Sequence, residues 1–212
     1  MSDIHGNSLA VKNIVQKTFA ESVDLVVVCG DITHFGDIIQ AKEVLKLLTI
    51  LNRPLFFVPG NCDSRELVNI QFFIGAENIH GRCRKMDGFN FLGVGGSPPT
   101  PFNTPFELSE EEIKNVLYKA YADINSNYRT ILVSHAPPIY TRTDLTSSGI
   151  NAGSRTVREF IEKVKPFLIL CGHIHEGKGT DAVGDSLVLN PGSSRSGSYA
   201  IVDINGDIRI KL

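Results

Sequence analysis

The chain has 212 residues, 42% of them apolar, which suits one globular domain with a sizeable core. Its formal net charge of −2 excludes a general attraction to nucleic acid or to an anionic membrane surface. No apolar stretch is long enough to span a bilayer, no signal peptide is visible, and the four cysteines form no C-x-x-C pair. We therefore expect a cytoplasmic protein with reduced thiols, built as a single domain over residues 1–212.

The first half of the chain alternates helical and strand patterns. We predict helices over 8–20 and 37–51, and strands over 24–29 and 54–58. Both strands are short apolar runs between helices, which is typical of parallel strands covered on both faces. This half is therefore predicted to be an α/β unit.

The start of the chain departs from that pattern. Only Met1 and Ser2 precede Asp3, whereas about five apolar residues precede the other polar clusters that follow strands. If Asp3 ends the first parallel strand, most of that strand is missing from this chain. Two explanations agree with this observation: the start codon is assigned too late, or the strand is naturally very short. In either case we expect a truncated first strand.

The pattern changes after residue 77. Strand-like segments at 78–80, 83–86 and 89–94 follow one another without a helix between them, which predicts antiparallel pairing. Ser109 and Glu112 have the spacing of a capping box, so a helix is expected to begin there.

The last third is predicted to begin with alternating elements and to end in strands. Strands over 130–135 and 167–171 flank a helix at 154–164. The segments SLVLN, SYAIVDI and DIRIKL predict an antiparallel meander with a turn at Asn205-Gly206. The whole order predicts two mixed sheets packed together with helices outside.

Seven side chains of metal-binding types fall in five short clusters, each where a predicted strand ends. They are Asp3 and His5 in SDIHGN, Asp31 in VVVCGDITHFG, Asn61 in FFVPGNCD, His135 in ILVSHAPP, and His173 with His175 in LILCGHIHEG. Carboxylate, amide and imidazole groups bind divalent ions such as Mn, Fe, Zn or Ni. Two such ions about 4 Å apart generate hydroxide and hold both ends of an in-line displacement at phosphorus.

Each of these motifs is a weak signal by itself, because a lone D-x-H is common and a lone histidine is more often structural. Their joint occurrence is informative, since ligands in open α/β sheets gather beyond the carboxyl ends of the strands. Asp31 is a carboxylate suited to bridge two ions, and the Asn61 amide limits negative charge near a phosphate. Together with His135, we expect these two residues to act at the reacting phosphate.

In these motifs the chain resembles the calcineurin-like metallophosphoesterases, and within them a small, Icc-related prokaryotic and archaeal branch. The family pattern is D-x-H, G-D, G-N-H-D/E, a late H and G-H-x-H, for which this chain has SDIH, CGDI, GNCD, SHAP and GHIH over residues 3–175. The resemblance implies a four-layer α/β/β/α sandwich with two divalent ions bridged by Asp31. It assigns Asp3, His5, Asp31 and His175 to the first ion, and Asp31, Asn61, His135 and His173 to the second.

Cys62 departs from the family pattern, which commonly has a histidine after the Gly-Asn pair. That histidine is thought to protonate the leaving group or to steady the transition state, and a thiol is a poorer proton donor than an imidazolium. Sequences with GNCD resemble phosphodiesterases more than phosphomonoesterases. A space-filling role for Cys62 fits equally well, and Asp63 is a candidate to orient a neighbouring ligand.

Other polar residues are candidates for substrate contacts. His34, three residues after Asp31, is a candidate substitute acid, although a surface loop histidine is the simpler interpretation. Arg142 lies in the stretch 136–153, which is long for a connector and typical of a binding loop, and a solvated arginine is again the simpler interpretation. We expect Pro98–Pro101 to wall the pocket, and the turn Asn190–Ser193 to support the metals through its backbone.

The function that these features predict is hydrolysis of a small phosphate ester, a phosphodiester or nucleotide-type substrate, by a hydroxide that bridges two divalent ions. A nuclease is a weaker variant, because no basic stripe with interleaved aromatic residues is present. The rival hypothesis is a non-catalytic metal-binding scaffold or protein-interaction module on the same fold. That rival predicts eroded ligand positions, whereas all seven are present here.

Overall fold

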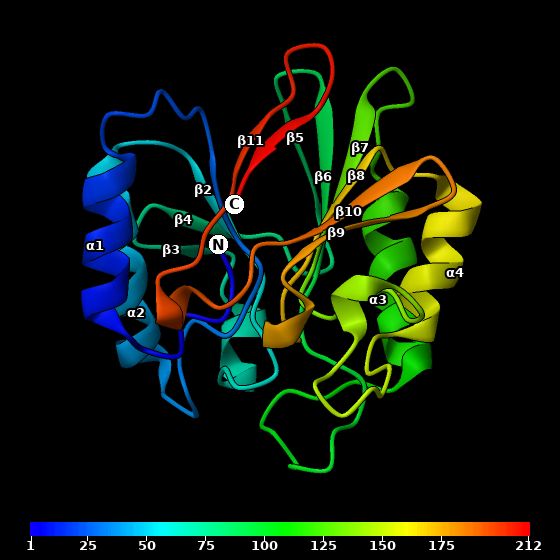
Figure 1. Cartoon of the computed structure of the whole chain (residues 1–212), viewed down its shortest axis with the longest axis horizontal. Coiled ribbons are helices and arrows are strands. Elements are labelled where there is room, and N and C mark those ends of the chain that lie inside the picture. The colour runs from blue at the N-terminus through cyan, green and yellow to red at the C-terminus, as the bar shows by residue number, and fades with distance from the viewer.

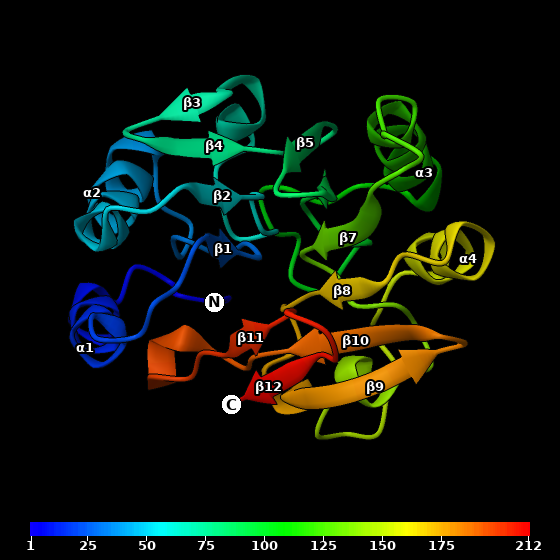
Figure 2. The same cartoon turned by 90° about the horizontal axis from the view of Figure 1, so that it is seen from above.

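The computed structural model describes all residues from 1 to 212. Two β-sheets face each other, with α1 and α2 outside one sheet and α3 and α4 outside the other (Figure 1). The view from above shows the same four layers in succession (Figure 2). The predicted α/β/β/α sandwich of two mixed sheets is confirmed. No helix has both the length and the apolar character needed to cross a membrane.

The first sheet has the strand order β1-β2-β4-β3, with β3 the one antiparallel member. It and its helices comprise α1 (Ser8–Thr18), β1 (Val26–Val28), α2 (Ile38–Leu48), β2 (Leu55–Phe57), β3 (Phe72–Phe73) and β4 (Ala76–Asn78). Short 3-10 helices follow at Thr49–Leu51 and Arg65–Asn69.

The second sheet has the order β5-β6-β7-β8-β10-β9, parallel in its middle and antiparallel at both edges. Its elements are β5 (Cys83–Met86), β6 (Phe89–Val94), α3 (Glu110–Tyr121), β7 (Arg129–Ser134), α4 (Arg155–Val164), β8 (Leu168–Leu170), β9 (Gly179–Val183) and β10 (Ser186–Asn190). Three 3-10 helices, Arg142–Asp144, His175–Gly177 and Ser194–Ser196, and the hairpin of β11 (Ile201–Asp203) with β12 (Arg209–Lys211) complete the chain.

Two predicted pairings are wrong in part. The segments after residue 77 do not form one antiparallel ladder: only β5 and β6 pair that way, whereas β4 pairs in parallel with β2 in the first sheet. The carboxyl-terminal segments are not one meander either, because β10 runs parallel to β8 and takes β9 as its antiparallel neighbour. The prediction overlooked β9 because its GTDAV sequence contains no apolar run.

Alternation along the strands divides the core into three parts. In β2, Leu55 and Phe57 pack with buried side chains of α1 and α2, whereas Phe56 packs in the layer between the two sheets. In β7, Leu132 faces α3 and α4, whereas Ile131 and Val133 face the layer between the sheets. Side chains on successive strand residues point to opposite faces, so a sheet covered on both faces needs an unbroken apolar run.

Residues 1–3 run beside β1. The Met1 amino group donates to Val27 O at 2.9 Å, Cys29 N donates to Met1 O at 2.9 Å, and Asp3 N donates to Gly30 O at 3.0 Å. On the other side, backbone bonds join residues 2 and 3 to residues 194 and 195. The first strand predicted to be truncated is thus a three-residue segment that backbone hydrogen bonds hold along both edges.

Both helices of the first half begin directly after polar loops. The Asn7 side chain accepts from Ala10 N at the start of α1, and the Asp37 side chain accepts from Gln40 N at the start of α2. The predicted capping box of Ser109 and Glu112 is present at the start of α3. Such caps satisfy backbone donors that the first helical turn leaves free, and they fix where each loop ends.

Candidate metal centre

The seven predicted ligands come together between the two sheets, where the parallel strands end. Asp31 follows β1, Asn61 follows β2 and His135 follows β7, and all three are buried. Asp3 ends the segment beside β1, His5 lies in the loop before α1, and His173 and His175 lie beyond β8. Segments at opposite ends of the sequence therefore build one site.

The Asp31 carboxylate lies between two groups of histidines. Its Oδ2 atom is 3.6 Å from His5 Nε2, and its Oδ1 atom is 3.4 Å from His135 Nε2. Cys62 N also donates to Oδ1, at 2.8 Å. The two oxygens thus face different imidazoles, which is the arrangement that a bridging carboxylate needs.

One group of donors surrounds Asp3. The Nε2 atoms of His5 and His175 are 3.2 Å apart, and His175 Nε2 is 3.5 Å from Asp3 Oδ1. The metal-binding atoms of these three residues all lie within 4.8 Å of one another. Converging imidazole nitrogens and a carboxylate form the ligand set of an ion such as zinc or manganese.

The second group centres on His135, whose tautomer is set by a carbonyl. Its Nδ1 atom is 2.7 Å from Cys29 O, which can only accept, so the neutral ring carries its proton on Nδ1. The Nε2 lone pair then points at Asn61 Oδ1, 2.8 Å away, and at Asp31 Oδ1. These three atoms, His135 Nε2, Asn61 Oδ1 and Asp31 Oδ1, lie close together, and such a set fits a bound cation.

His173 approaches both groups. Its backbone N–H donates to both carboxylate oxygens of Asp3 at 3.1 Å, and its ring centroid is 5.1 Å from that of His135. Its ring therefore lies beside that of His135, but its nitrogens belong to none of the clusters of metal-binding atoms that lie within 4.8 Å of one another.

Left-handed backbone is concentrated at the ligands. Asp3, His5, Asp31 and His173 have φ values of 55°, 48°, 51° and 67°. Side chains with a Cβ carry an energetic penalty there, and such strain gathers at functional sites. Gly60 is needed for a related reason, because an added Cβ would collide with the Asp31 carboxylate.

Burial keeps two of these imidazoles neutral, whereas the hydrogen bond to Asp3 raises the pKa of His175. Burial lowers the pKa of His5 to about 4 and that of His173 to about 3. Burial, together with the neighbouring Asp3 and Asp63 carboxylates, raises the pKa of Asp31 to about 7. Neutral imidazole is the form that binds metals, and a buried carboxylate with a raised pKa gains most from a nearby cation. His5 Nδ1 is buried without a hydrogen-bond partner.

Hydrogen bonds behind the ligands hold their loops. Asp63 accepts from Ile32 N, Thr33 N and Gly60 N, at 3.1, 2.7 and 2.8 Å, and so ties the Asp31 loop to the Asn61 loop. This contact agrees with the role predicted for Asp63, acting through the loop backbone.

The turn after β10 supports the opposite side. Ser193 Oγ donates to Asp3 O at 2.9 Å, and Asn190 Nδ2 donates to Ile174 O at 2.8 Å, between His173 and His175. The sequence predicted support from this turn through its backbone, and it missed the contribution of these two side chains. The run NPGS between apolar strand and loop is the signal that could have found them.

The three candidates for substrate contact lie at different distances from the ligands. His34 is exposed, with its ring centroid 5.2 Å from that of His5, and one His34 ring nitrogen, one His5 ring nitrogen and Cys62 Sγ lie within 4.8 Å of one another. Burial and the Asp31 carboxylate raise the pKa of the Cys62 thiol. Arg142 is exposed in a 3-10 helix and is anchored by its backbone N–H to Asp181, with no hydrogen bond or ion pair from its side chain.

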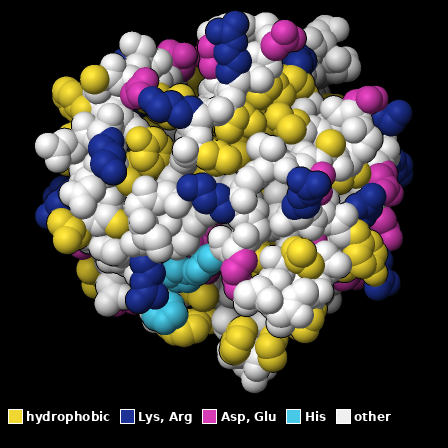
Figure 3. Space-filling model, in the orientation of Figure 1, with side chains coloured by type: hydrophobic (Ala, Val, Ile, Leu, Met, Phe, Trp, Pro, Cys, Tyr) yellow, Lys and Arg dark blue, Asp and Glu magenta, His cyan; other side chains and the backbone are white.

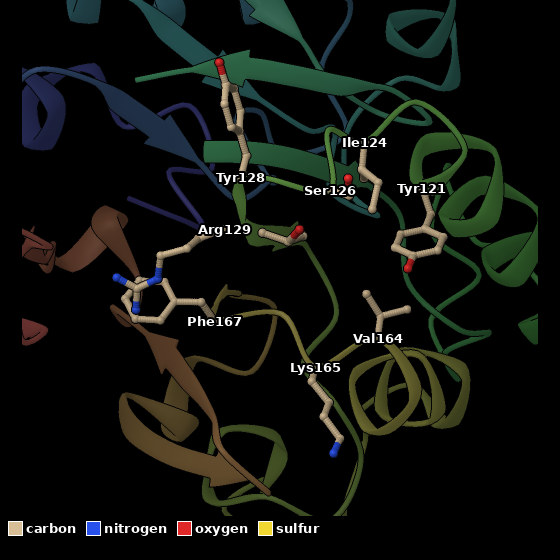
Figure 4. A pocket seen from close by; sticks show the side chains of 9 residues that line it. Tyr121, Ile124, Ser126, Tyr128, Arg129, Val164, Lys165 and Phe167 are labelled. Carbon is tan, nitrogen blue, oxygen red and sulfur yellow. The ribbon is translucent and has the colours of Figure 1, made fainter. Parts of the chain in front are cut away.

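The site reaches the surface beside a hollow. Histidine side chains emerge together at the lower left of the space-filling view, next to a basic and an acidic side chain (Figure 3). A hollow of about 330 Å³ adjoins them, lined by His5, His34, Gln40 and Glu43 among others. Another hollow, of about 360 Å³, contains none of the predicted ligands, and there Arg129 lies over the ring of Phe167, 3.3 Å from its centroid (Figure 4).

Comparison with known proteins gives consistent matches. A family model described as calcineurin-like phosphoesterase matches residues 1–177. An uncharacterized protein of Methanocaldococcus jannaschii is 38% identical over 208 residues, covering 96% of this chain and 89% of that protein. A probable cyclic nucleotide phosphodiesterase of Vesicomyosocius okutanii is 23% identical, covering 87% and 76%.

Solved structures share the fold. The structure of the protein TT1561 from Thermus thermophilus superposes with a TM-score of 0.78 at 19% identity, covering 100% of this chain and 96% of that one. A dimetal phosphatase from Danio rerio has a TM-score of 0.62 at 15% identity, covering 97% and 86%.

The chain belongs to the calcineurin-like phosphoesterase family. Members of this family are hydrolases of phosphoesters that depend on a pair of divalent metal ions. The donor set described above fits such a pair, since two groups of imidazoles and carboxyl or amide oxygens share Asp31.

Proposed function

We propose that this protein is a phosphodiesterase of small, nucleotide-type substrates that uses two divalent ions held by the seven ligands. Asp3, His5, Asp31 and His175 would hold one ion, and Asp31, Asn61, His135 and His173 the other. When bound, such ions supply Lewis acidity and activate water for attack on phosphorus.

The observation that carries this proposal is the position of the Asp31 carboxylate. Its two oxygens face His5 and His135 at 3.6 and 3.4 Å, so one buried side chain joins the two donor groups. A structural carboxylate at this depth would require hydrogen bonds or a cationic partner for each oxygen, but only Oδ1 receives a backbone hydrogen bond.

The surrounding residues have distinct tasks in this reaction. Asp63 and the turn after β10 hold the ligand loops in place. The raised pKa of Cys62 keeps the thiol protonated, so the side chain fills space and is a weak acid toward a leaving oxygen. His34, exposed beside His5, is the imidazole available to exchange a proton with the departing group.

Preference for a diester rests on three observations. Without a histidine at position 62, a substrate whose leaving group needs little protonation is favoured. The hollow beside the ligands has the volume of a small-molecule pocket and carries Gln40 and Glu43, which can hydrogen-bond to a base or sugar. A probable cyclic nucleotide phosphodiesterase is among the relatives.

Metal-dependent turnover tests the proposal. The protein is stripped with a chelator, reloaded with Mn²⁺ or Zn²⁺, and assayed with bis(p-nitrophenyl) phosphate, p-nitrophenyl phosphate and cyclic nucleotides. We expect turnover that requires metal and is faster on the diesters. Absence of turnover by a protein that holds two ions would favour the scaffold hypothesis, and faster hydrolysis of the monoester would overturn the diester preference.

A further inference from the structure

The side-chain amide of Asn61 has two chemically different ends, and only one of them can face a metal ion. Its Oδ1 atom points toward His135 Nε2 at 2.8 Å, and its Nδ2 atom donates to Thr104 Oγ1 at 3.1 Å. Cys62 Sγ, 3.6 Å from Nδ2, is a weak second acceptor. Rotating the end of this side chain by half a turn would direct N–H donors toward the ion.

Glu107, which binds Thr104, decides which atom donates and which accepts in the hydrogen bond between Asn61 and Thr104. Glu107 Oε1 accepts from Thr104 Oγ1 at 2.7 Å, from Thr104 N at 2.9 Å and from Thr100 Oγ1 at 2.6 Å. Burial opposes its ionisation, but the hydrogen bonds from Thr100 and Thr104 lower the pKa of Glu107 to about 2. An ionised carboxylate can only accept, so the Thr104 hydroxyl proton is committed to it.

A hydroxyl whose proton is committed can serve its other neighbour only as an acceptor. Thr104 Oγ1 therefore requires an N–H at the position that Asn61 Nδ2 occupies. We propose that Thr104 is a positioning residue, whose hydroxyl, oriented by Glu107, holds the Asn61 amide with its oxygen facing the metal centre. This inference rests on the proposed function, because it assigns Asn61 to a metal.

The same contacts join the metal centre to a surface loop. Phe106 N donates to Asn61 O at 3.0 Å, so both the backbone and the side chain of Asn61 bind the loop 98–107. This loop contains the proline-rich run that the sequence predicted to wall the pocket, and it carries Phe102, which is 78% exposed. The position of the loop and the orientation of a metal ligand are thereby coupled.

Metal titration of matched variants tests the inference. Chelator-stripped wild-type protein is titrated calorimetrically with Mn²⁺. The Asn61→Ala variant identifies which of the two binding events involves Asn61, because that event is lost in it. The Mn²⁺ affinity of this event is then compared among the variants. Thr104→Val removes the hydroxyl at nearly constant volume, and we expect the ion of this event to bind at least ~10-fold more weakly, as for other partners behind a metal ligand. Thr104→Ser keeps the hydroxyl and should retain wild-type affinity.

Thr100→Val is the matched control for loop loosening. Thr100 donates to the same Glu107 oxygen but has no contact with Asn61, so we expect affinity near that of the wild type. In the Asn61→Ala background, Thr104→Val should weaken the remaining ion no further. Melting of the metal-free variants identifies any general loss of folding.

The outcomes separate the two proposals. Equal affinity of Thr104→Val and wild type, failure of Thr104→Ser to retain binding, an equal loss in Thr100→Val, or a persistent effect without Asn61 would each overturn the positioning role while the dinuclear site stands. A wild-type protein that binds fewer than two ions would overturn the proposed function, and the positioning role with it.

Discussion

The two sides of the candidate metal centre are held in different ways. On the Asn61 side, His135 is fully buried, its Nδ1 is anchored to the Cys29 carbonyl, and the Asn61 amide is anchored to Thr104. On the Asp3 side, the His175 side chain is 43% exposed and His5 Nδ1 has no partner. Ligands with fixed outer contacts bind metals more tightly, so we expect the proposed ion on the Asn61 side to be held more firmly than the one on the Asp3 side.

The largest effect is expected where both sides meet. Asp31→Asn removes the charge that the two donor groups share, so both ions should bind more weakly and turnover should fall by at least ~100-fold, more than for a residue behind the ligands. Metal content and diesterase activity of the purified variant measure this. Unchanged occupancy with unchanged turnover would contradict the bridging role of Asp31.

Replacing one histidine on each side by alanine should show which of the two ions each side binds. His135→Ala should lose the ion on the Asn61 side and lower the free energy of unfolding of the metal-free protein by about 1–3 kcal/mol, because truncation of the fully buried ring leaves a cavity and removes one of the two hydrogen bonds to Cys29 O, the other being that from Ser2 Oγ. His175→Ala should lose only the other ion and stay within about 0.5 kcal/mol of wild type, as expected at an exposed position. Chemical unfolding with chelator present, and metal analysis without it, provide the comparison. Equal destabilisation by both changes would remove the distinction between the sides.

Metal uptake should depend on pH through Asp31. Its pKa of about 7 in the metal-free protein means that below pH 7 an entering ion must displace a proton, so affinity should fall as the pH decreases below about 7 and level off above it. His5 and His173, with pKa values of about 4 and 3, are already neutral in this range and release none. The hydrogen bond to Asp3 raises the pKa of His175, so this imidazole is a second source of protons, and the comparison is made in the His175→Ala variant, which lacks it. Calorimetry in two buffers of different ionisation enthalpy counts the protons released. No proton release at about one pH unit below the Asp31 pKa would show that Asp31 enters the reaction already ionised.

The smallest effect is expected at Cys62. Cys62→Ala should change turnover of a diester with a good leaving group only slightly, because the protonated thiol contributes little acid catalysis. Cys62→His should raise activity selectively toward substrates with poor leaving groups. Loss of turnover in Cys62→Ala with both ions still bound would make the thiol catalytic.

The sequence predicted most of the fold and the convergence of the seven ligands because both depend on local patterns. Apolar runs followed by Gly-Asp, Gly-Asn or Gly-His specify a buried strand and the loop at its end, and the ends of neighbouring parallel strands must meet. The left-handed backbone of Asp3 and His173 was not predictable, because only a folded environment imposes such φ values on residues with a Cβ.

The contacts behind the ligands escaped prediction for a different reason. Thr104 lies 43 residues from Asn61, and Asn190 lies 16 residues from Ile174. No helical or strand period in the sequence links the members of either pair. Threonine and asparagine in loops are common and usually bond locally, which hides the few that act at long range. Strand β9 was missed similarly, since an exposed edge strand has no apolar run.

The hydrogen bonds that Asp3 O accepts from the segment after β10 affect the order in which the candidate metal centre assembles. Ser193 Oγ and Arg195 N both bond to Asp3 O, a contact between the two ends of the sequence. A nascent chain exposes Asp3 and His5 before the other candidate ligands, but Asp3 O can bond to Ser193 and Arg195 only once the segment after β10 has left the ribosome. Assembly of the Asp3 side is therefore a late step of synthesis, after the Asn61 loop and His135 have already emerged.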